Sequence, residues 1–317
     1  MTTSAFDAIN GLEQINNSGS PEGIVEYKLK SVFKNYSLYA RHWPVASPKA
    51  IAIIIHGAGE HCGRYDEMAS LLNKESIYAF ANDHIGHGRS DGEKLCLDKF
   101  ETYTDDCHKH LLLVQERFPD LKVFCIGHSL ITELGIIGTY YSYSMGGLIA
   151  VDLAVKIPKA FAGVVLISPC LAIAPEAASF FTIMAMKVIS FFLPKMQINR
   201  IDAKFVSRDE KEVESYNTDP LVWHGGLRAH FCKEVYDAVC KITKISKSIE
   251  WPYLVMHGDQ DKLCEISGSE SFHNAARSSD KTYKRYEGFY HALHKEPVDS
   301  RKIIFEDLLK WINDRMD

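Results

Sequence analysis

The chain has 317 residues, of which 46% are hydrophobic and 24% are charged, values that are ordinary for a protein with a packed apolar core. Its length suits one large domain and does not require two. The formal net charge is -5 without any basic block or stripe, so we exclude DNA and RNA as partners. The eight cysteines contain no C-x-x-C pair and favour a reducing compartment.

Residues 1–26 form a polar N-terminal segment that is rich in Asn, Ser and Gly. The segment lacks the charged and then apolar pattern of a signal peptide, so we expect synthesis in the cytoplasm. Residues 27–317 are predicted to form a single domain.

Short apolar runs alternate with longer stretches of helical periodicity along this domain. The runs are too short for helices and predict buried strands at Ile51 to Ile55, Tyr78 to Ala81, Val123 to Ile126, Val164 to Ile167 and Tyr253 to Met256. The longer stretches predict helices at Asp98 to Arg117, Met145 to Ile157, Ser267 to Ala276 and Arg301 to Met316. This alternation predicts an α/β fold, with a mostly parallel central sheet and helices on both faces.

The alternation stops between about residues 170 and 250, which predicts an inserted helical cap. The cap contains an apolar stretch, Ala177 to Leu193, that carries Lys187 and ends at Pro194. This stretch is too short and too interrupted for a transmembrane helix. We expect it to pack on the main domain and to contact a membrane surface, so that the protein is cytoplasmic and peripherally membrane-associated.

Two glycine-rich turns follow the first two predicted strands. His56 to His61 is the first turn, and its glycines allow the backbone to bend sharply. The second turn contains His84 and His87, but neither paired thiolates nor an H-E-x-x-H helix accompanies them. We therefore expect no metal site.

Carboxylates and histidines follow the late strands. Asp259 and Asp261 come just after Tyr253 to Met256, and His291 stands 30 residues (291 − 261) after Asp261. A serine becomes a nucleophile when an imidazole takes its proton, and an aspartate holds that imidazole in the correct tautomer. Acid followed by histidine is the chain order of the Ser-Asp-His triad in the α/β-hydrolase fold. Spacing alone leaves Asp259 as a rival acid and His294 as a rival base.

Five stretches resemble the monoacylglycerol lipase family. They are H-G-A-G-E-H-x-G-R-Y (56–65), D-H-I-G-H-G-R-S-D-G-E (83–93), S-M-G-G-L-I-A (144–150), D-K-L-C (261–264) and Y-E-G-F-Y-H-A-L-H-K-E (286–296). The resemblance runs from about Lys34 to the end and includes the cap. It implies an α/β-hydrolase that cleaves a lipid ester, monoacylglycerol, to fatty acid and glycerol without a cofactor.

The resemblance also implies roles for particular residues. It implies Asp261 as the triad acid, His291 as the base and Ala58 as a donor to the oxyanion hole. It places Glu60, Arg64 and His294 near the polar glycerol end of the substrate. It implies that the apolar cap holds the acyl chain of the substrate.

The chain departs from the family at the nucleophile elbow. The family runs from strand to helix through G-H-S-M-G-G, whereas here residues 127–129 (Gly-His-Ser) and 144–147 (Ser-Met-Gly-Gly) are separated by a surplus of 15 residues (144 − 129). The tight turn needs small side chains two positions before and after the nucleophile. Ser144 meets this condition on both sides, whereas Ser129 is followed by Ile131.

We therefore predict Ser144 as the nucleophile, with Ser129 as the alternative. Met145 is then the second oxyanion donor, at the start of a helix whose dipole favours negative charge. Removing residues 129–143 restores an intact motif, so we interpret them as a translated splice remnant. Because they are expected to emerge at the strand edge where substrate enters, we also expect them to impair activity. The other readings are a lysophospholipase or carboxylesterase, and a catalytically silent hydrolase-like protein that only binds lipid.

Overall fold

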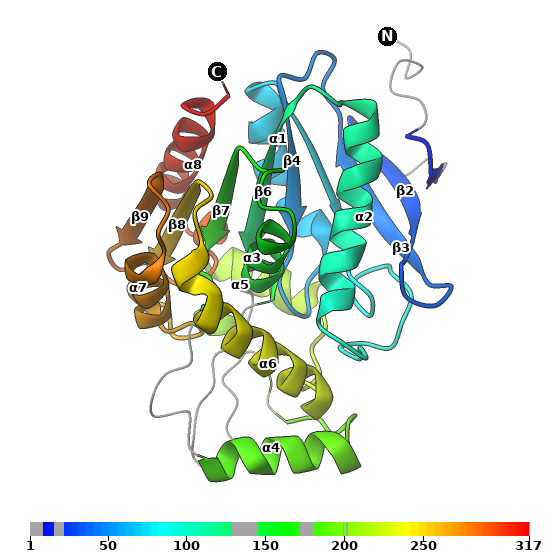
Figure 1. The fold of residues 1–317 in the computed structure, drawn as a ribbon, viewed down its shortest axis with the longest axis vertical. Coiled ribbons are helices and arrows are strands. Elements are labelled where there is room, and N and C mark those ends of the chain that lie inside the picture. The colour runs from blue at the N-terminus through cyan, green and yellow to red at the C-terminus, as the bar shows by residue number, and fades with distance from the viewer. Residues whose placement is uncertain are drawn as a thin grey trace.

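A nine-stranded sheet forms the centre of the part of the chain that the computed structural model describes, which is residues 9–15, 22–128, 145–171, 180–198, 200 and 202–316 (Figure 1). The strands are β1 Leu12–Gln14, β2 Val25–Lys30, β3 Ser37–Trp43, β4 Ala50–Ile55, β5 Ile77–Asn82, β6 Lys122–His128, β7 Gly163–Ile167, β8 Tyr253–Gly258 and β9 Lys281–Tyr286. Their order in space is β1-β2-β3-β5-β4-β6-β7-β8-β9. β1 to β3 pair antiparallel, as β3 does with β5, and every pair from β5 to β9 is parallel.

The side chains of β4 alternate between two apolar layers. Ile51, Ile53 and Ile55 belong to one cluster, with residues of the helices α2 Glu101–Arg117, α3 Gly146–Lys156, α6 Ala229–Ile245 and α7 Ile266–Ala275. Ala50, Ala52 and Ile54 belong to the other cluster, with residues of α1 Asp66–Lys74 and α8 Val298–Asn313. Because a strand with both faces buried is apolar throughout, β4 reads as one continuous apolar run. The predicted α/β fold, with a mostly parallel sheet and helices on both faces, is confirmed.

All five predicted strands are present, as β4 to β8, with ends within two residues of the prediction. The four predicted helices correspond to α2, α3, α7 and α8. The strands that the sequence analysis missed are β1, β2, β3 and β9. The predicted boundary at residue 26 falls inside β2, so part of the polar N-terminal segment joins the sheet.

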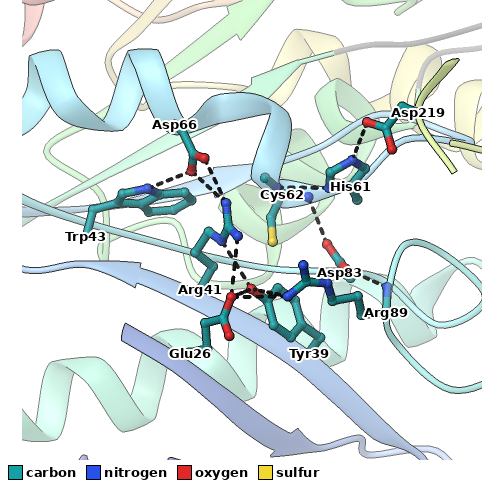
Figure 2. A network of polar contacts seen from close by, with 11 residues as sticks. Glu26, Tyr39, Arg41, Trp43, His61, Cys62, Asp66, Asp83, Arg89 and Asp219 are labelled. Atoms are coloured by element: carbon teal, nitrogen blue, oxygen red, sulfur yellow. Dashed lines mark hydrogen bonds and ion pairs between the residues drawn. The ribbon is translucent and has the colours of Figure 1, made fainter. Parts of the chain in front are cut away.

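Buried charges explain why β2 and β3 were missed. Glu26 and Arg41 are both buried, and their charged groups lie 3.4 Å apart. The Arg41 guanidinium also donates to Asp66 of α1 at 2.8 Å, and the Tyr39 hydroxyl donates to Glu26 at 2.5 Å (Figure 2). Buried charges are tolerated when they are paired in this way. Strands that contain them do not appear in the sequence as apolar runs.

The region between β7 and β8 is the cap, and its described residues add three α-helices and no strand to the sheet. The helices are α4 Phe180–Phe192, α5 Glu210–Thr218 and α6. α4 lies at the end of the molecule away from the sheet and packs on α6 through buried Met186 (Figure 1). Its other side is apolar yet open, with Phe191 79% and Phe192 71% exposed. Among the described helices, none has the length and apolar character needed to cross a bilayer.

The two described ends of the interrupted elbow lie against each other. A Cβ atom on Gly127, in β6, would stand 2.6 Å from the carbonyl oxygen of Gly146, the first residue of α3. A Cβ on Gly146 would stand 2.3 Å from the His128 oxygen and 2.5 Å from the Ile55 oxygen. The predicted insertion, residues 129–143, lies outside the described residues. The end of β6 and the start of α3, which precede and follow the insertion, are therefore in close backbone contact.

We expect Gly146→Ala to lower the free energy of unfolding by about 2–3 kcal/mol, because a methyl group there meets three backbone carbonyls that cannot move away independently. Urea denaturation measures this loss. Gly23→Ala is the matched control, since Gly23 has φ +81° but no atom within 4 Å of the place that an alanine methyl group would take. The control should lose only about 1 kcal/mol through backbone strain. Equal losses in the two variants would contradict the close strand-to-helix junction.

Candidate active site

The predicted catalytic residues gather at the carboxyl edge of the sheet. Ala58 follows β4, Met145 immediately precedes α3, Asp261 follows β8 and His291 follows β9 (Figure 1). Loops at the carboxyl ends of parallel strands meet at one edge, where α/β proteins bind ligands. The two candidate nucleophiles, Ser129 and Ser144, lie outside the described residues.

Asp261 and His291 form a buried pair. Asp261 Oδ2 lies 2.6 Å from His291 Nδ1, and both side chains are fully buried. The second carboxylate oxygen accepts the backbone N–H groups of Leu263 at 2.8 Å and Cys264 at 2.9 Å. At the end of β7, the Ser168 hydroxyl donates to the His291 carbonyl at 2.6 Å. The loop after β8 thus holds the Asp261 carboxylate, and Ser168 at the end of β7 holds the backbone of His291.

The environment of Asp261 keeps its carboxylate ionised. Burial alone would raise the pKa of Asp261, but the charge and hydrogen bonds of His291 and His257 outweigh burial and place this pKa well below the usual 3.8. His257 Nε2 lies 3.2 Å from Asp261 Oδ2 and 3.2 Å from the Cys264 carbonyl. Because both neighbours are acceptors, this nitrogen carries a proton and donates to Asp261. An ionised aspartate can hold the His291 tautomer that leaves Nε2 able to accept a proton.

The two rivals occupy other positions. Asp259 lies 3.2 Å from Arg285 and accepts the Gly288 N–H at 2.7 Å, so its carboxylate is engaged away from His291. His294 is buried in a short 3-10 helix, where its ring stacks on Tyr65 at 5.0 Å between centroids. The geometry favours Asp261 and His291 as the acid and the base.

Ala58 and Met145 are both buried in the same apolar cluster at the ends of β4 and β6. Gly59, next to Ala58, has φ +76°, a conformation that glycine adopts without strain. Met145 is the residue before α3, so its N–H is at the positive end of that helix. Backbone N–H groups in these positions can stabilise an oxyanion.

A buried carboxylate organises the polar side of the site. Glu60 Oε1 accepts the Gly57 N–H at 2.8 Å and the Tyr65 hydroxyl at 2.5 Å, and His128 Nδ1 lies 3.3 Å away. Since the Tyr65 proton goes to Glu60, His128 Nδ1 donates to the Tyr65 oxygen at 2.7 Å. Burial alone would raise the pKa of Glu60, but His128 and the Arg64 charge outweigh it and hold the pKa well below 4.5.

The three predicted substrate-binding residues, Glu60, Arg64 and His294, come together around Tyr65. Arg64 Nε lies 3.6 Å from Glu60 Oε2, and His294 stacks on the Tyr65 ring. The His128 ring is 4.4 Å from the His294 ring and 5.5 Å from the His291 ring, so this polar cluster adjoins the Asp261–His291 pair.

Burial lowers the pKa of His294 well below 6.5, and the neighbouring His128, Lys295 and Arg64 lower it further. Burial also lowers the pKa of His128 despite the nearby Glu60 carboxylate. His128 Nε2 and His294 Nδ1 are buried without a hydrogen-bond partner among the described residues. Neutral imidazole nitrogens of this kind can bind hydroxyl groups.

Comparisons with known proteins relate the chain to proteins of known family. A family model described as serine aminopeptidase, S33, matches residues 46–130 and 139–298. The monoglyceride lipase of Mus musculus is 38% identical over 280 residues, which cover 88% of each chain. The human monoglyceride lipase is 38% identical over 88% of this chain and 87% of its own. The chain belongs to the monoglyceride lipase family.

Solved structures of other proteins also resemble this chain. The monoacylglycerol lipase of Paleococcus ferrophilus has a TM-score of 0.72 and 27% identity, over 88% of this chain and 99% of its own. A thermostable carboxyl esterase of Bacillus coagulans in complex with glycerol has a TM-score of 0.76 over 94% of this chain and 100% of its own, but only 20% identity. The second likeness supports the α/β-hydrolase fold alone.

Sequence analysis missed several residues that the geometry brings into the site. Tyr65 lies within the quoted motif at 56–65, and His128 lies within the first half of the elbow, so both carried a local signal. His257 stands only four residues before Asp261 and carried such a signal too, whereas the cap residues Tyr216 and Asp219, which contact Arg64, carried none. Their places depend on long-range folding that no local spacing reveals.

Asp261→Asn is expected to reduce kcat for ester hydrolysis by about 10³-fold to 10⁴-fold, because a neutral amide no longer holds the His291 tautomer or stabilises its protonated form. Steady-state kinetics on a soluble ester measures this effect. Asp259→Asn is the matched control, and its kcat should stay within about threefold because Asp259 pairs with Arg285 and the Gly288 N–H and not with His291. A larger loss for the control than for Asp261→Asn would transfer the acid role to Asp259.

Proposed function

We propose that this protein hydrolyses monoacylglycerols to a fatty acid and glycerol through an acyl-serine intermediate. The observation that carries the proposal is the fully buried Asp261–His291 pair beside the polar cluster of Glu60, Arg64 and His294. Membership of the monoglyceride lipase family supports the choice of substrate.

In the proposed mechanism the Ser144 hydroxyl attacks the ester carbonyl while His291 Nε2 takes its proton. The N–H groups of Ala58 and Met145 stabilise the oxyanion of the tetrahedral intermediate. The intermediate collapses to the acyl-serine when His291 returns the proton to the departing glycerol oxygen. Water, activated by the same imidazole, then releases the fatty acid and restores the serine.

In the proposed complex, the polar cluster binds the glycerol end of the substrate. Glu60 accepts hydrogen bonds, Arg64 donates them, and His128 and His294 each hold a buried nitrogen without a partner among the described residues. Glycerol offers hydroxyl groups that both donate and accept, so it matches this mixture of groups. A simple alkyl ester would leave these buried polar atoms unsatisfied.

Labelling with a fluorophosphonate probe tests the proposed nucleophile. We expect one adduct per chain on Ser144, located by peptide mass mapping, because that serine has small neighbours on both sides and precedes α3. Ser144→Ala should abolish labelling, whereas Ser129→Ala, the matched control, should keep it. An adduct on Ser129 would move the nucleophile to the other half of the elbow.

The same experiment tests the insertion and the substrate. A variant without residues 129–143 should label faster and release more fatty acid from monoacylglycerol than the full chain, because its elbow motif is then uninterrupted. Equal rates of labelling and fatty-acid release in the two proteins would contradict the hypothesis that the insertion impairs activity. Absence of monoacylglycerol hydrolysis in both proteins would overturn the proposed function.

We infer in addition that the cap contacts a membrane surface and that the protein is cytoplasmic. The support is the exposed apolar side of α4, which contains Phe191 and Phe192, continued by exposed Leu193 and Met196. Exposed apolar patches of this kind are uncommon on monomeric proteins without an interaction site. A membrane-docked cap would take an acyl chain from the bilayer directly into the site.

Replacing both Phe191 and Phe192 with Ser should weaken binding to phosphatidylcholine vesicles by about tenfold or more, because two aromatic side chains no longer leave water on docking. Vesicle co-sedimentation measures the binding. The control replaces Val298 and Ile303, which are exposed at 63% and 50% on α8, with Ser. If the control weakens binding as much as the α4 variant, the cap is not the docking face.

A further inference from the structure

Asp219, in the cap, contacts two side chains of the loop that follows β4. It is the residue directly after α5, and its carboxylate Oδ2 lies 2.9 Å from His61 Nε2 and 3.6 Å from Arg64 Nη1. Figure 2 shows the cap carboxylate reaching His61 from the side opposite the Arg41 and Asp66 pair. Only 19% of the Asp219 side chain is exposed, so the contact is largely shielded from solvent.

The hydrogen bonds of His61 fix its tautomer. His61 Nδ1 accepts the Gly63 N–H at 3.2 Å, so the proton of the neutral ring is on Nε2 and is donated to Asp219. Partial burial would raise the pKa of Asp219, but the hydrogen bonds from His61 and from the Leu221 N–H and the charge of Arg64 outweigh it and lower the pKa. Asp219 is therefore an anion at neutral pH, and Arg64 is the positive charge beside it.

Arg64 lies between two carboxylates. Its guanidinium is 3.6 Å from Glu60 Oε2 and 3.6 Å from Asp219 Oδ2, and it stands over the Tyr216 ring at 5.3 Å. Both distances exceed that of a direct hydrogen bond, and among the described residues the guanidinium makes none that is shorter. Its N–H groups are thus held in place by charge and remain available to a ligand.

A second contact ties the same part of the cap to the oxyanion loop. The Trp223 N–H donates to the Gly59 carbonyl at 2.7 Å, next to the candidate oxyanion donor Ala58. Asp219 Oδ1 accepts the N–H of Leu221 at 2.9 Å, which fixes the carboxylate within its own turn. The segment 219–223 therefore positions Arg64 and the oxyanion loop together.

We propose that Asp219 is a positioning residue that makes the site selective for the glycerol part of the substrate, by holding the Arg64 guanidinium where its N–H groups meet the glycerol hydroxyls. This inference rests on the proposed function. A ligand with these hydroxyls depends on the orientation of Arg64, whereas a ligand with the same chain and no hydroxyls does not. A purely structural role for Asp219 would affect both ligands alike.

Binding to the full-length protein tests the inference without any need for turnover. The probes are a short-chain glycerol monoalkyl ether and the methyl ether of the same alkyl chain, and isothermal titration calorimetry gives each Kd. Asp219→Asn keeps the size and the acceptor for His61 but removes the charge beside Arg64. The Kd of the glycerol ether should rise about 5-fold to 20-fold, and that of the methyl ether should stay within about twofold.

Asp209→Asn is the matched control, because Asp209 caps the other end of α5 and Asn caps equally well. It should change neither Kd. If Asp219→Asn fails to fold, Asp219→Glu replaces it and should weaken the glycerol ether more than the methyl ether. Equal weakening of both ethers, or of neither, overturns the inference. Hydrolysis of monoacylglycerol by the unchanged protein is measured separately. A failure of the proposed function can therefore be distinguished from a failure of this inference.

Discussion

The ionised carboxylate of Glu60, buried at the carboxyl edge of the sheet, joins the parts of the site that come from separate elements. One of its oxygens accepts the Gly57 N–H of the oxyanion loop and the hydroxyl of Tyr65, and it lies beside His128 at the end of β6. Its other oxygen faces Arg64, which leads to the cap. An ionised group can occupy such a place only when hydrogen bonds and opposite charge offset its lost hydration. The groups that offset it are therefore fixed as well.

The same rule accounts for the rest of the polar architecture. Asp83 accepts the N–H groups of Cys62 and Arg89, both at 2.8 Å, and thereby ties the turn after β5 to the turn after β4 (Figure 2). Arg41 of β3 holds Asp66 at the start of α1. Each buried charge connects two loops or strands that are distant in the sequence. The loop that contains Ala58 consequently has fixed neighbours on the sheet side and on the cap side.

Sequence reasoning succeeded where a single physical effect dominates a local stretch. β4 to β8 are buried on both faces and read as apolar runs. The predicted acid and base, Asp261 and His291, follow late strands, and the structure brings their side chains into contact. It failed where the environment is mixed. β9, Lys281–Tyr286, is an edge strand with polar side chains, and β2 contains Glu26, whose burial depends on its cross-strand partner Arg41 in β3. Asp259 and Asp261 are equivalent by spacing; the family resemblance implies Asp261, and the 2.6 Å contact with His291 favours it too.

The residues on either side of the interrupted elbow lie in close contact, although the motif is interrupted in the sequence. The family model matches through residue 130 and again from residue 139, so the stretch that it leaves unmatched, residues 131–138, falls inside the surplus of residues 129–143. Closing a loop of about fifteen residues costs only roughly 2–3 kcal/mol in chain entropy, because the cost grows with the logarithm of length. Gly127 is paired with Ile55 of β4, and Gly146 is the first residue of α3, so regular elements hold the two glycines in close contact. The prediction that the insertion impairs activity therefore concerns access of the substrate to the serine, and not the packing of the described residues on either side.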